Sequence, residues 1–113
     1  MVRHRQGPLL LLLLVAVVYA GVLGNGFHFD DFHTVVNNPH IRDLARVPSF
    51  FLDAEAFSVN PESAMYRPLL LTTFAIDHAL FGTKAAGYHA VNVLLHGLAS
   101  VAVLCWLTAI GLK

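Results

Sequence analysis

Charged residues are unevenly distributed along this chain and leave two long stretches without any. No Asp, Glu, Lys or Arg occurs from Gln6 to Phe29, and none occurs from Ala85 to Leu112. A helix needs roughly 20 predominantly apolar residues to cross a hydrocarbon core. The pattern therefore predicts two transmembrane helices, over residues 8–24 and 85–112, joined by a loop over residues 25–84.

The loop divides into a turn-rich part and a helical part. In the second part, Pro68 suits the first turn of a helix and Gly82 suits the position after a helix end. Residues 68–81 are therefore predicted to form one helix, too short to span and placed at the interface or re-entrant. The expected fold class is mainly α and integral to a membrane. The turn-rich part carries the breakers Asn25-Gly26, Asn37-Asn38-Pro39, Val47-Pro48 and Asn60-Pro61.

Composition supports a membrane protein and predicts its orientation. Of the 113 residues, 57% are hydrophobic and 12% are charged, about half the charged share of a soluble domain. Arg3 and Arg5 precede the first apolar stretch and Lys113 follows the second, so the positive-inside tendency places both termini, including residues 1–7, in the cytoplasm. The loop, with all seven acidic residues, then faces outward from a bacterial inner membrane or into the endoplasmic reticulum. No basic patch exists for a nucleic-acid partner.

A secretory signal is the alternative for the first apolar stretch. The basic start and the leucine run suit an n-region and an h-region, and Val18-Tyr-Ala20 suits a cleavage site. Because Gly21-Val-Leu-Gly24 continues the apolar stretch past that site, the sequence favours a retained helix. Cleavage would leave a secreted loop, tethered by one helix, that binds a metal. An intact N-terminus on the purified protein would exclude that possibility.

An adjacent acidic pair, Asp30 and Asp31, follows the first apolar stretch within a few residues. A membrane helix would deliver both carboxylates to the lipid–water boundary, where an enzyme acting on a lipid-borne substrate needs a base. In an extended segment the two side chains would point to opposite sides. One could then act as general base while the other binds a cation or orients a partner. The alternative is two solvated acids, or caps of a following turn.

Tyr66 and Arg67 come directly before the predicted short helix. An arginine at that position can fork onto phosphate oxygens, and the helix N-terminus adds partial positive charge. Both residues are therefore candidates for binding a lipid phosphate or pyrophosphate. Interfacial anchoring suits a Tyr-Arg pair equally well.

A polar stripe interrupts the second apolar stretch. His89, Asn92 and His96 are spaced by three and four residues, so they share one helical face. Polar residues inside a span are costly and face protein or a water-filled cavity. The stripe predicts a helix packed against other helices, either through interhelical hydrogen bonds or as the lining of a substrate groove.

The seven histidines raise the question of a metal site. His28, Asp30, Asp31 and His33 place nitrogen and oxygen ligands close together. No fixed zinc spacing is present, and the single cysteine, Cys105, lies inside the second apolar stretch. We therefore predict no metal ligands, and the sequence leaves a divalent metal requirement open.

Short motifs follow one another from about Gly24 to Leu112: Asn25-Gly-Phe-x-Phe-Asp-Asp31, Asn38-Pro-x-Ile41, Tyr66-Arg-Pro-Leu69 with Thr73-Phe74, Phe81-Gly82, Gly87-Tyr-His89, Asn92 and Leu95-His96. Each is weak alone, but their order and gaps resemble the N-terminal part of one family. It is the family of GT-C class membrane glycosyltransferases joined to tetratricopeptide repeats, the transmembrane-and-tetratricopeptide-repeat O-mannosyltransferases and their bacterial relatives.

The resemblance implies a base, a donor and an acceptor. In such enzymes one carboxylate of an acidic pair beside the first span is the base, and Asp30 and Asp31 match that pair. The donor would be a polyprenyl-phosphate sugar, of the dolichol-phosphate mannose type in eukaryotes, and the acceptor a Ser or Thr hydroxyl or a glycan. Transfer would invert the anomeric centre while the lipid phosphate leaves. Arg67 is our candidate for stabilising that phosphate.

The chain departs from the family after the second span, where family members continue with more spans and then repeats. Two spans and one loop cannot enclose a sugar and exclude water. We therefore expect this truncated GT-C-like polypeptide to be inactive alone, as a fragment, a truncated product or a subunit. Its partners would be membrane lipid, the lipid-linked donor, an acceptor protein and the missing helices or a partner subunit. The alternative is a small non-enzymatic membrane protein that binds larger membrane partners through its helices.

Overall fold

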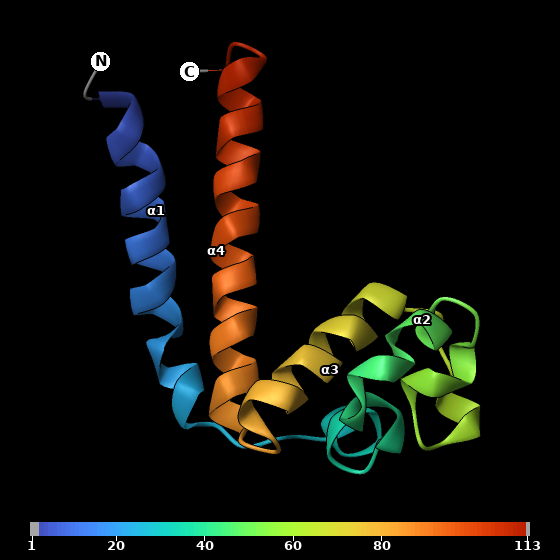
Figure 1. The fold of residues 1–113 in the computed structure, drawn as a ribbon. Coiled ribbons are helices and arrows are strands. Elements are labelled where there is room, and N and C mark those ends of the chain that lie inside the picture. Colours follow the sequence, from blue (N-terminus) through green and yellow to red (C-terminus); the bar gives the residue numbers. More distant parts are fainter. Residues whose placement is uncertain (1–2, 113) are drawn as a thin grey trace. The chain divides into compact units, whose positions relative to one another are not determined.

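The computed structural model describes residues 3–112, and these residues form helices, turns and connecting segments without a β-strand. The chain divides into two compact units (Figure 1). One unit, the helix pair, comprises residues 1–25 and 89–113, and the other, the loop unit, comprises residues 26–88. The predicted fold class is confirmed: the described chain is mainly α and contains two helices long and apolar enough to span a membrane. The α-helices are α1 (Arg3–Tyr19), α2 (Val47–Phe50), α3 (Pro68–Phe81) and α4 (Ala85–Ala109).

The helix pair contains both helices that are long and apolar enough to cross a membrane, over Gln6–Gly24 and Ala85–Ala109. The α-helical part of the first starts at Arg3, before the predicted range 8–24, and a 3₁₀ helix over Ala20–Gly24 continues it. Few of the residues in either apolar stretch are buried, so their exposed apolar side chains need lipid or other helices as neighbours. Lys113, on which the predicted orientation partly rests, lies outside the described residues.

Within the helix pair, α1 and α4 lie side by side and run antiparallel (Figure 1). A Cβ atom at Gly97 would lie 3.0 Å from Leu12 Cδ2, so the missing side chain lets the helices approach. Farther along the pair, the rings of Tyr19 and His96 meet edge to face with centroids 5.2 Å apart. An aromatic contact of this kind keeps the two helices in a fixed register.

The loop unit is built from short helical turns, two of which are N-capped by aspartate side chains. Asp43 accepts a hydrogen bond from the backbone N–H of Ala45 at 2.9 Å, and Asp53 does the same for Glu55 at 2.9 Å. Such acceptors satisfy the first unpaired N–H groups of a turn, which is why Asp favours these positions. The turns enclose a small core of Val35, Ile41, Phe50, Ala56, Phe57, Leu71, Ala75 and Tyr88.

A fully buried amide, Asn38, joins the turns of the loop unit. Its Nδ2 donates to the carbonyl oxygens of Thr34, Ala56 and Phe57 at 3.1, 3.0 and 3.3 Å. Its Oδ1 accepts from the N–H of His40 at 3.0 Å. One side chain therefore satisfies buried backbone groups from three segments, which no strand or disulfide connects in the described chain.

The helix α3 occupies the range in which the sequence predicts a short helix, and its place at an interface stays a prediction. Gly82, with φ +60°, ends it in a conformation that residues with a side chain rarely adopt. The Tyr88 hydroxyl donates to the Gly82 carbonyl at 2.8 Å, which fixes the turn into α4. A Cβ at Gly87 would come within 2.2 Å of the Phe81 ring, so only glycine fits there.

Replacing Asn38 by Asp tests its role as the joining side chain. The substitution keeps the shape but exchanges two N–H donors for an acceptor that faces three carbonyl oxygens. We expect the loop unit to lose roughly 3 kcal/mol or more of unfolding free energy, measured by thermal or urea unfolding in detergent. Asn37→Asp is the matched control because Asn37 is exposed, and it should leave the transition near that of the wild type. Equal behaviour of the two variants would contradict the assignment.

Asp77 lies on the buried face of α3, with 3% of its surface exposed. Burial raises the pKa of its carboxyl from 3.8 to about 6. The folded state therefore favours the protonated form, and this contribution to stability is complete below about pH 4 and lost as pH rises through about 6.

Asp77→Asn should remove this pH dependence because the amide cannot ionise. We expect the unfolding midpoint of the variant, relative to the wild type, to rise between about pH 4 and pH 6 and to stay level above pH 6. Thermal unfolding in detergent at a series of pH values measures the difference. A difference that stays constant across this range would show that Asp77 is not a desolvated carboxyl.

Candidate functional site

The acidic pair lies at the start of a helical turn, and this corrects the predicted extended segment. Asp31 has φ −59° and ψ −28°, and a short π-helix over Phe32–Val36 follows it. The Thr34 hydroxyl donates to the Asp30 carbonyl at 2.8 Å, which holds the turn closed. Adjacent residues in a helical turn are about 100° apart, so the two carboxylates are not on opposite sides of the backbone.

The two carboxylates have different partners. Asp31 Oδ2 accepts the N–H of His28 at 3.0 Å, and the N–H of Asp31 donates to the His28 carbonyl at 2.9 Å. Asp31 is therefore tied to the backbone that precedes the turn. The Asp30 side chain is 92% exposed, and its Oδ1 lies 3.3 Å from Nε2 of His33. Asp30 is the more exposed carboxylate of the pair.

His33 connects the acidic turn to a second segment. Its Nδ1 lies 2.8 Å from Oγ of Ser58, and its carbonyl oxygen accepts the N–H of Val59 at 3.0 Å. The Ser58 hydroxyl oxygen also accepts the N–H of Asn60 at 2.9 Å. A chain of polar groups thus runs from the buried Ser58 to the exposed Asp30.

Arg67 is the residue directly before α3, and its backbone carbonyl accepts the N–H of Leu71 at 3.0 Å. Its guanidinium carbon lies 5.7 Å from the centre of the buried Phe57 ring. Contact with an aromatic face holds the exposed cation in place without neutralising it. Tyr66, the other predicted phosphate ligand, instead donates its hydroxyl to the Phe51 carbonyl at 3.0 Å.

One cavity of about 490 Å³ in the loop unit brings together both aspartates and Arg67. Its size is within the range of about 300–1,000 Å³ that is common for small-molecule sites. Its wall combines polar and apolar side chains. Tyr66 is outside the lining. The lining residues are Asp30, Asp31, His33, Thr34, Phe57, Glu62, Ser63, Ala64, Met65, Arg67, Leu70 and Phe74.

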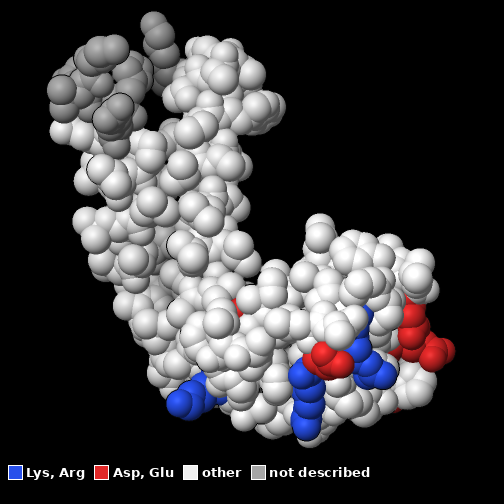
Figure 2. All heavy atoms as spheres, viewed as in Figure 1, with Lys and Arg blue, Asp and Glu red and all other residues white. Residues whose placement is uncertain are grey.

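The charged side chains visible in Figure 2 gather on the loop unit, while the apolar helices are almost without charge. Three carboxylates, those of Asp30, Asp31 and Glu62, line the cavity together with one guanidinium. Where the structure describes the chain, no group of three or more His, Cys, Asp or Glu residues is arranged to hold a metal ion. The cavity lining thus carries more acidic than basic side chains.

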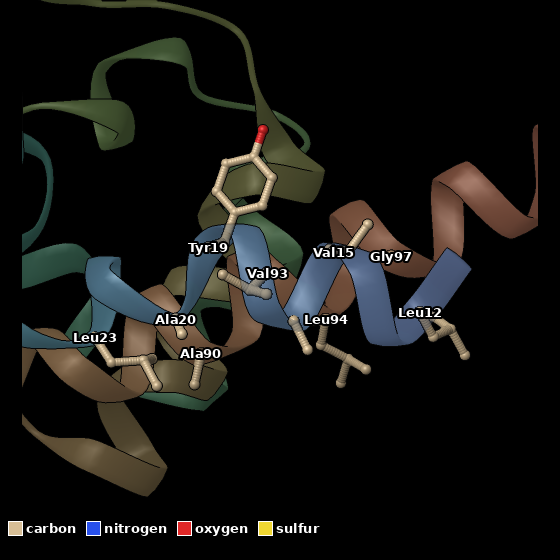
Figure 3. A pocket seen from close by; sticks show the side chains of 10 residues that line it. Leu12, Val15, Tyr19, Ala20, Leu23, Ala90, Val93, Leu94 and Gly97 are labelled. Carbon is tan, nitrogen blue, oxygen red and sulfur yellow. The ribbon is translucent and has the colours of Figure 1, made fainter. Parts of the chain in front are cut away.

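The predicted polar stripe belongs to the helix pair. His89, Asn92 and His96 line a cavity of about 300 Å³ together with Tyr19, and Asn92 and His96 are exposed. A neighbouring apolar cavity of about 390 Å³ is lined by side chains from both helices (Figure 3). The stripe shares its cavity with neither aspartate.

Sequence reasoning missed His33 as a partner of Asp30 and Ser58 as a partner of His33. The spacing of three between Asp30 and His33 places them on one face only if the segment is helical, and it was expected to be extended. Ser58 is 25 residues from His33 along the chain, and no sequence pattern indicates that contact.

Comparison with known proteins identifies relatives. A protein O-mannosyl-transferase of Caenorhabditis elegans is 32% identical over 96 residues, 82% of this chain and 14% of the worm protein. Human TMTC4 is 37% identical over 94 residues, 77% of this chain and 12% of its own length. Mouse TMTC3 is 29% identical over 95 residues, 81% of this chain and 10% of its own length. Both mammalian proteins are also named protein O-mannosyl-transferases.

No family model matches the chain, and no solved structure matches it with significant similarity. The chain spans only about a seventh or less of the relatives named above. Over most of its own length, the chain is therefore homologous to a segment of the TMTC protein O-mannosyl-transferases, as its ordered motifs predict.

Proposed function

We propose that this chain forms part of the donor and acceptor site of a membrane glycosyltransferase. The transferase takes a sugar from a polyprenyl phosphate, mannose in the leading case, to a Ser or Thr hydroxyl. The observation that carries the proposal is the single cavity that contains the reachable Asp30 carboxylate and the Arg67 guanidinium. The names of the relatives support mannose and protein acceptors.

Asp30 is the proposed base. As the acceptor oxygen attacks the anomeric carbon, the hydroxyl proton passes to the Asp30 carboxylate and the bond from that carbon to the phosphate oxygen breaks. One displacement of this kind inverts the anomeric centre, and the lipid phosphate leaves with the electron pair. Asp31 has a supporting role because one of its oxygens already accepts the N–H of His28. It keeps the turn in the conformation that presents Asp30.

Arg67 is the proposed partner of the leaving phosphate. Its guanidinium can donate to two phosphate oxygens, and the N-terminus of the 14-residue helix α3 adds partial positive charge beside it. The aromatic contact with Phe57 reduces the freedom that the side chain loses on binding. Tyr66 contributes by anchoring the segment through Phe51 and is not assigned a phosphate contact.

Charge balance indicates that other protein segments complete the site. Three carboxylates and one guanidinium line the cavity, so a dianionic phosphate would meet net repulsion there. Further cationic groups or a divalent metal must then come from additional helices or a partner subunit. We place the loop over residues 25–84 on the extracytoplasmic side and both termini in the cytoplasm, as Arg3, Arg5 and Lys113 beside the apolar stretches predict.

A second candidate function, binding of larger membrane partners, is favoured by the stripe of His89, Asn92 and His96. Two of its members are exposed on a helix that is apolar enough to span, where unpaired polar groups are costly. These side chains can hydrogen-bond to a neighbouring helix. Transfer by an Asp30→Asn variant distinguishes the two roles, because loss of transfer is expected only if this chain takes part in catalysis.

Asp30→Asn should abolish transfer, with a loss of at least about 100-fold, because an amide cannot accept the proton. The measurement is mannose transfer in membranes from dolichyl-phosphate mannose to a Ser/Thr peptide. The protein is human TMTC4 with this chain in place of its matching segment, which supplies the remaining helices. Asp31→Asn should reduce transfer less, because an amide oxygen still accepts the N–H of His28.

Asp43→Asn is the matched control for these variants, since Asp43 also caps a turn but does not line the cavity. It should keep the activity of the unsubstituted chimera. Full activity of Asp30→Asn, in a chimera that is itself active, would refute the assignment of the base. Equal losses in Asp30→Asn and Asp43→Asn would indicate a folding effect.

Arg67→Gln should weaken use of the donor, with KM for dolichyl-phosphate mannose raised about tenfold, because one charged phosphate contact is lost. Arg67→Lys should recover part of that loss, since lysine keeps the charge but not the forked geometry. Arg46→Gln is the control, because Arg46 is exposed and outside the cavity. If both glutamine variants behave alike, Arg67 has no specific part in donor binding.

A further inference from the structure

We infer that His33 and Ser58 are positioning residues that fix the Asp30 carboxylate through an ordered chain of hydrogen bonds. In this chain the Ser58 hydroxyl donates to Nδ1 of His33, and Nε2–H of His33 donates to Oδ1 of Asp30. The catalytic consequence rests on the proposed function, in which Asp30 is the base. The hydrogen-bond chain itself stands on the geometry alone.

The direction of the chain follows from the chemistry of its ends. An ionised carboxylate can only accept hydrogen bonds, so the contact of 3.3 Å between Asp30 Oδ1 and His33 Nε2 requires a proton on Nε2. In the neutral ring Nδ1 then carries a lone pair and must accept. Its neighbour, Oγ of Ser58 at 2.8 Å, is a hydroxyl that can donate to it.

The other contacts of Ser58 leave its proton available for His33. The Ser58 oxygen accepts the N–H of Asn60 at 2.9 Å, which uses one of its lone pairs. Ser58 is buried, with 4% of its surface exposed, so water does not compete freely for its hydroxyl. The hydroxyl hydrogen is therefore directed toward Nδ1 of His33.

The backbone holds both sides of this contact in register. The N–H of Val59 donates to the carbonyl oxygen of His33 at 3.0 Å, next to the Ser58 contact. The π-helix over Phe32–Val36 sets the direction of the imidazole, and the Thr34 hydroxyl closes the same turn onto Asp30. The ring itself is held by Ser58, and these backbone contacts fix the segment that carries it.

The consequence for transfer is a choice between the two oxygens of Asp30. The imidazole N–H occupies Oδ1 and leaves Oδ2 for the acceptor hydroxyl, which limits rotation of an otherwise exposed side chain. Holding a base in its productive rotamer raises the rate of proton transfer without changing how tightly the acceptor binds.

Nitrogen-15 NMR of histidine-labelled protein tests the direction of the chain. The 113-residue chain is measured in detergent micelles at alkaline pH, where imidazole is neutral, and the His33 signal is assigned by its disappearance in His33→Gln. We expect His33 to be a single Nε2–H tautomer whose Nδ1 accepts a hydrogen bond. Ser58→Ala should remove that bond and move the Nδ1 signal toward that of an unbonded ring nitrogen, while Asp30 keeps the proton on Nε2.

Ser49→Ala is the control, because Ser49 donates to the carbonyl of Arg46 and contacts no histidine. It should leave the His33 signal unchanged. A predominant Nδ1–H tautomer in the wild type would overturn the inference, since two acceptors would then face each other. A His33 signal that does not respond to Ser58→Ala would overturn it as well.

Kinetics of the TMTC4 chimera separate this inference from the proposed function. His33→Leu should lower kcat about tenfold at unchanged KM for the peptide, and His33→Gln should restore most of the rate because its amide can donate from the same position. Loss of transfer in Asp30→Asn with full kcat in His33→Leu would overturn the positioning role and keep the function. The expected tautomer together with an active Asp30→Asn would support the hydrogen-bond chain and overturn the function.

Discussion

The buried amide of Asn38 is the interaction on which the loop unit and its cavity depend. Its Nδ2 donates to the Thr34 carbonyl, and Thr34 in turn donates its hydroxyl to the carbonyl of Asp30. The same nitrogen donates to the carbonyls of Ala56 and Phe57. Asn38 therefore fixes the acidic turn and the segment facing it at the same time. In a unit of short turns, with no strand among the described residues, such a cross-connection replaces a sheet ladder.

The difference between the two aspartates is a consequence of this backbone arrangement. Once the turn is closed, the Asp31 carboxylate lies within reach of the N–H that precedes the turn, whereas Asp30 faces the cavity. Two adjacent residues of another segment also contact different side chains of the cavity. The Phe57 ring contacts the Arg67 guanidinium, and the Ser58 hydroxyl contacts His33. The proposed base Asp30 and phosphate ligand Arg67 are thus exposed, whereas Phe57 and Ser58 are buried.

Much of the fold could be predicted from the sequence, because its main signals are local. These are the length of each apolar stretch and the helix boundaries marked by Pro68 and Gly82. Because such boundary signals act over a few residues, α3 has the expected bounds. The helix α1 instead begins at Arg3, before the stretch without charged residues. The acidic turn was misjudged because the Asn38 amide that bonds the Thr34 carbonyl also bonds the carbonyls of Ala56 and Phe57, 18 and 19 residues away along the chain, and no local pattern indicates those contacts. Ser58 could not be found from sequence, since only folding brings it to His33.

Two separate features of this chain call for polar or cationic partners that lipid does not provide. Few residues of either apolar helix are buried, and α4 exposes Asn92 and His96, which lipid chains cannot satisfy. In the loop unit, three carboxylates and one guanidinium line a cavity proposed to receive a phosphate. Lipid could cover the apolar faces, but it supplies neither hydrogen-bond partners for α4 nor cations for the cavity. Additional helices that carry polar and basic side chains would meet both deficits, which is why the proposed function includes protein beyond these two helices and their loop.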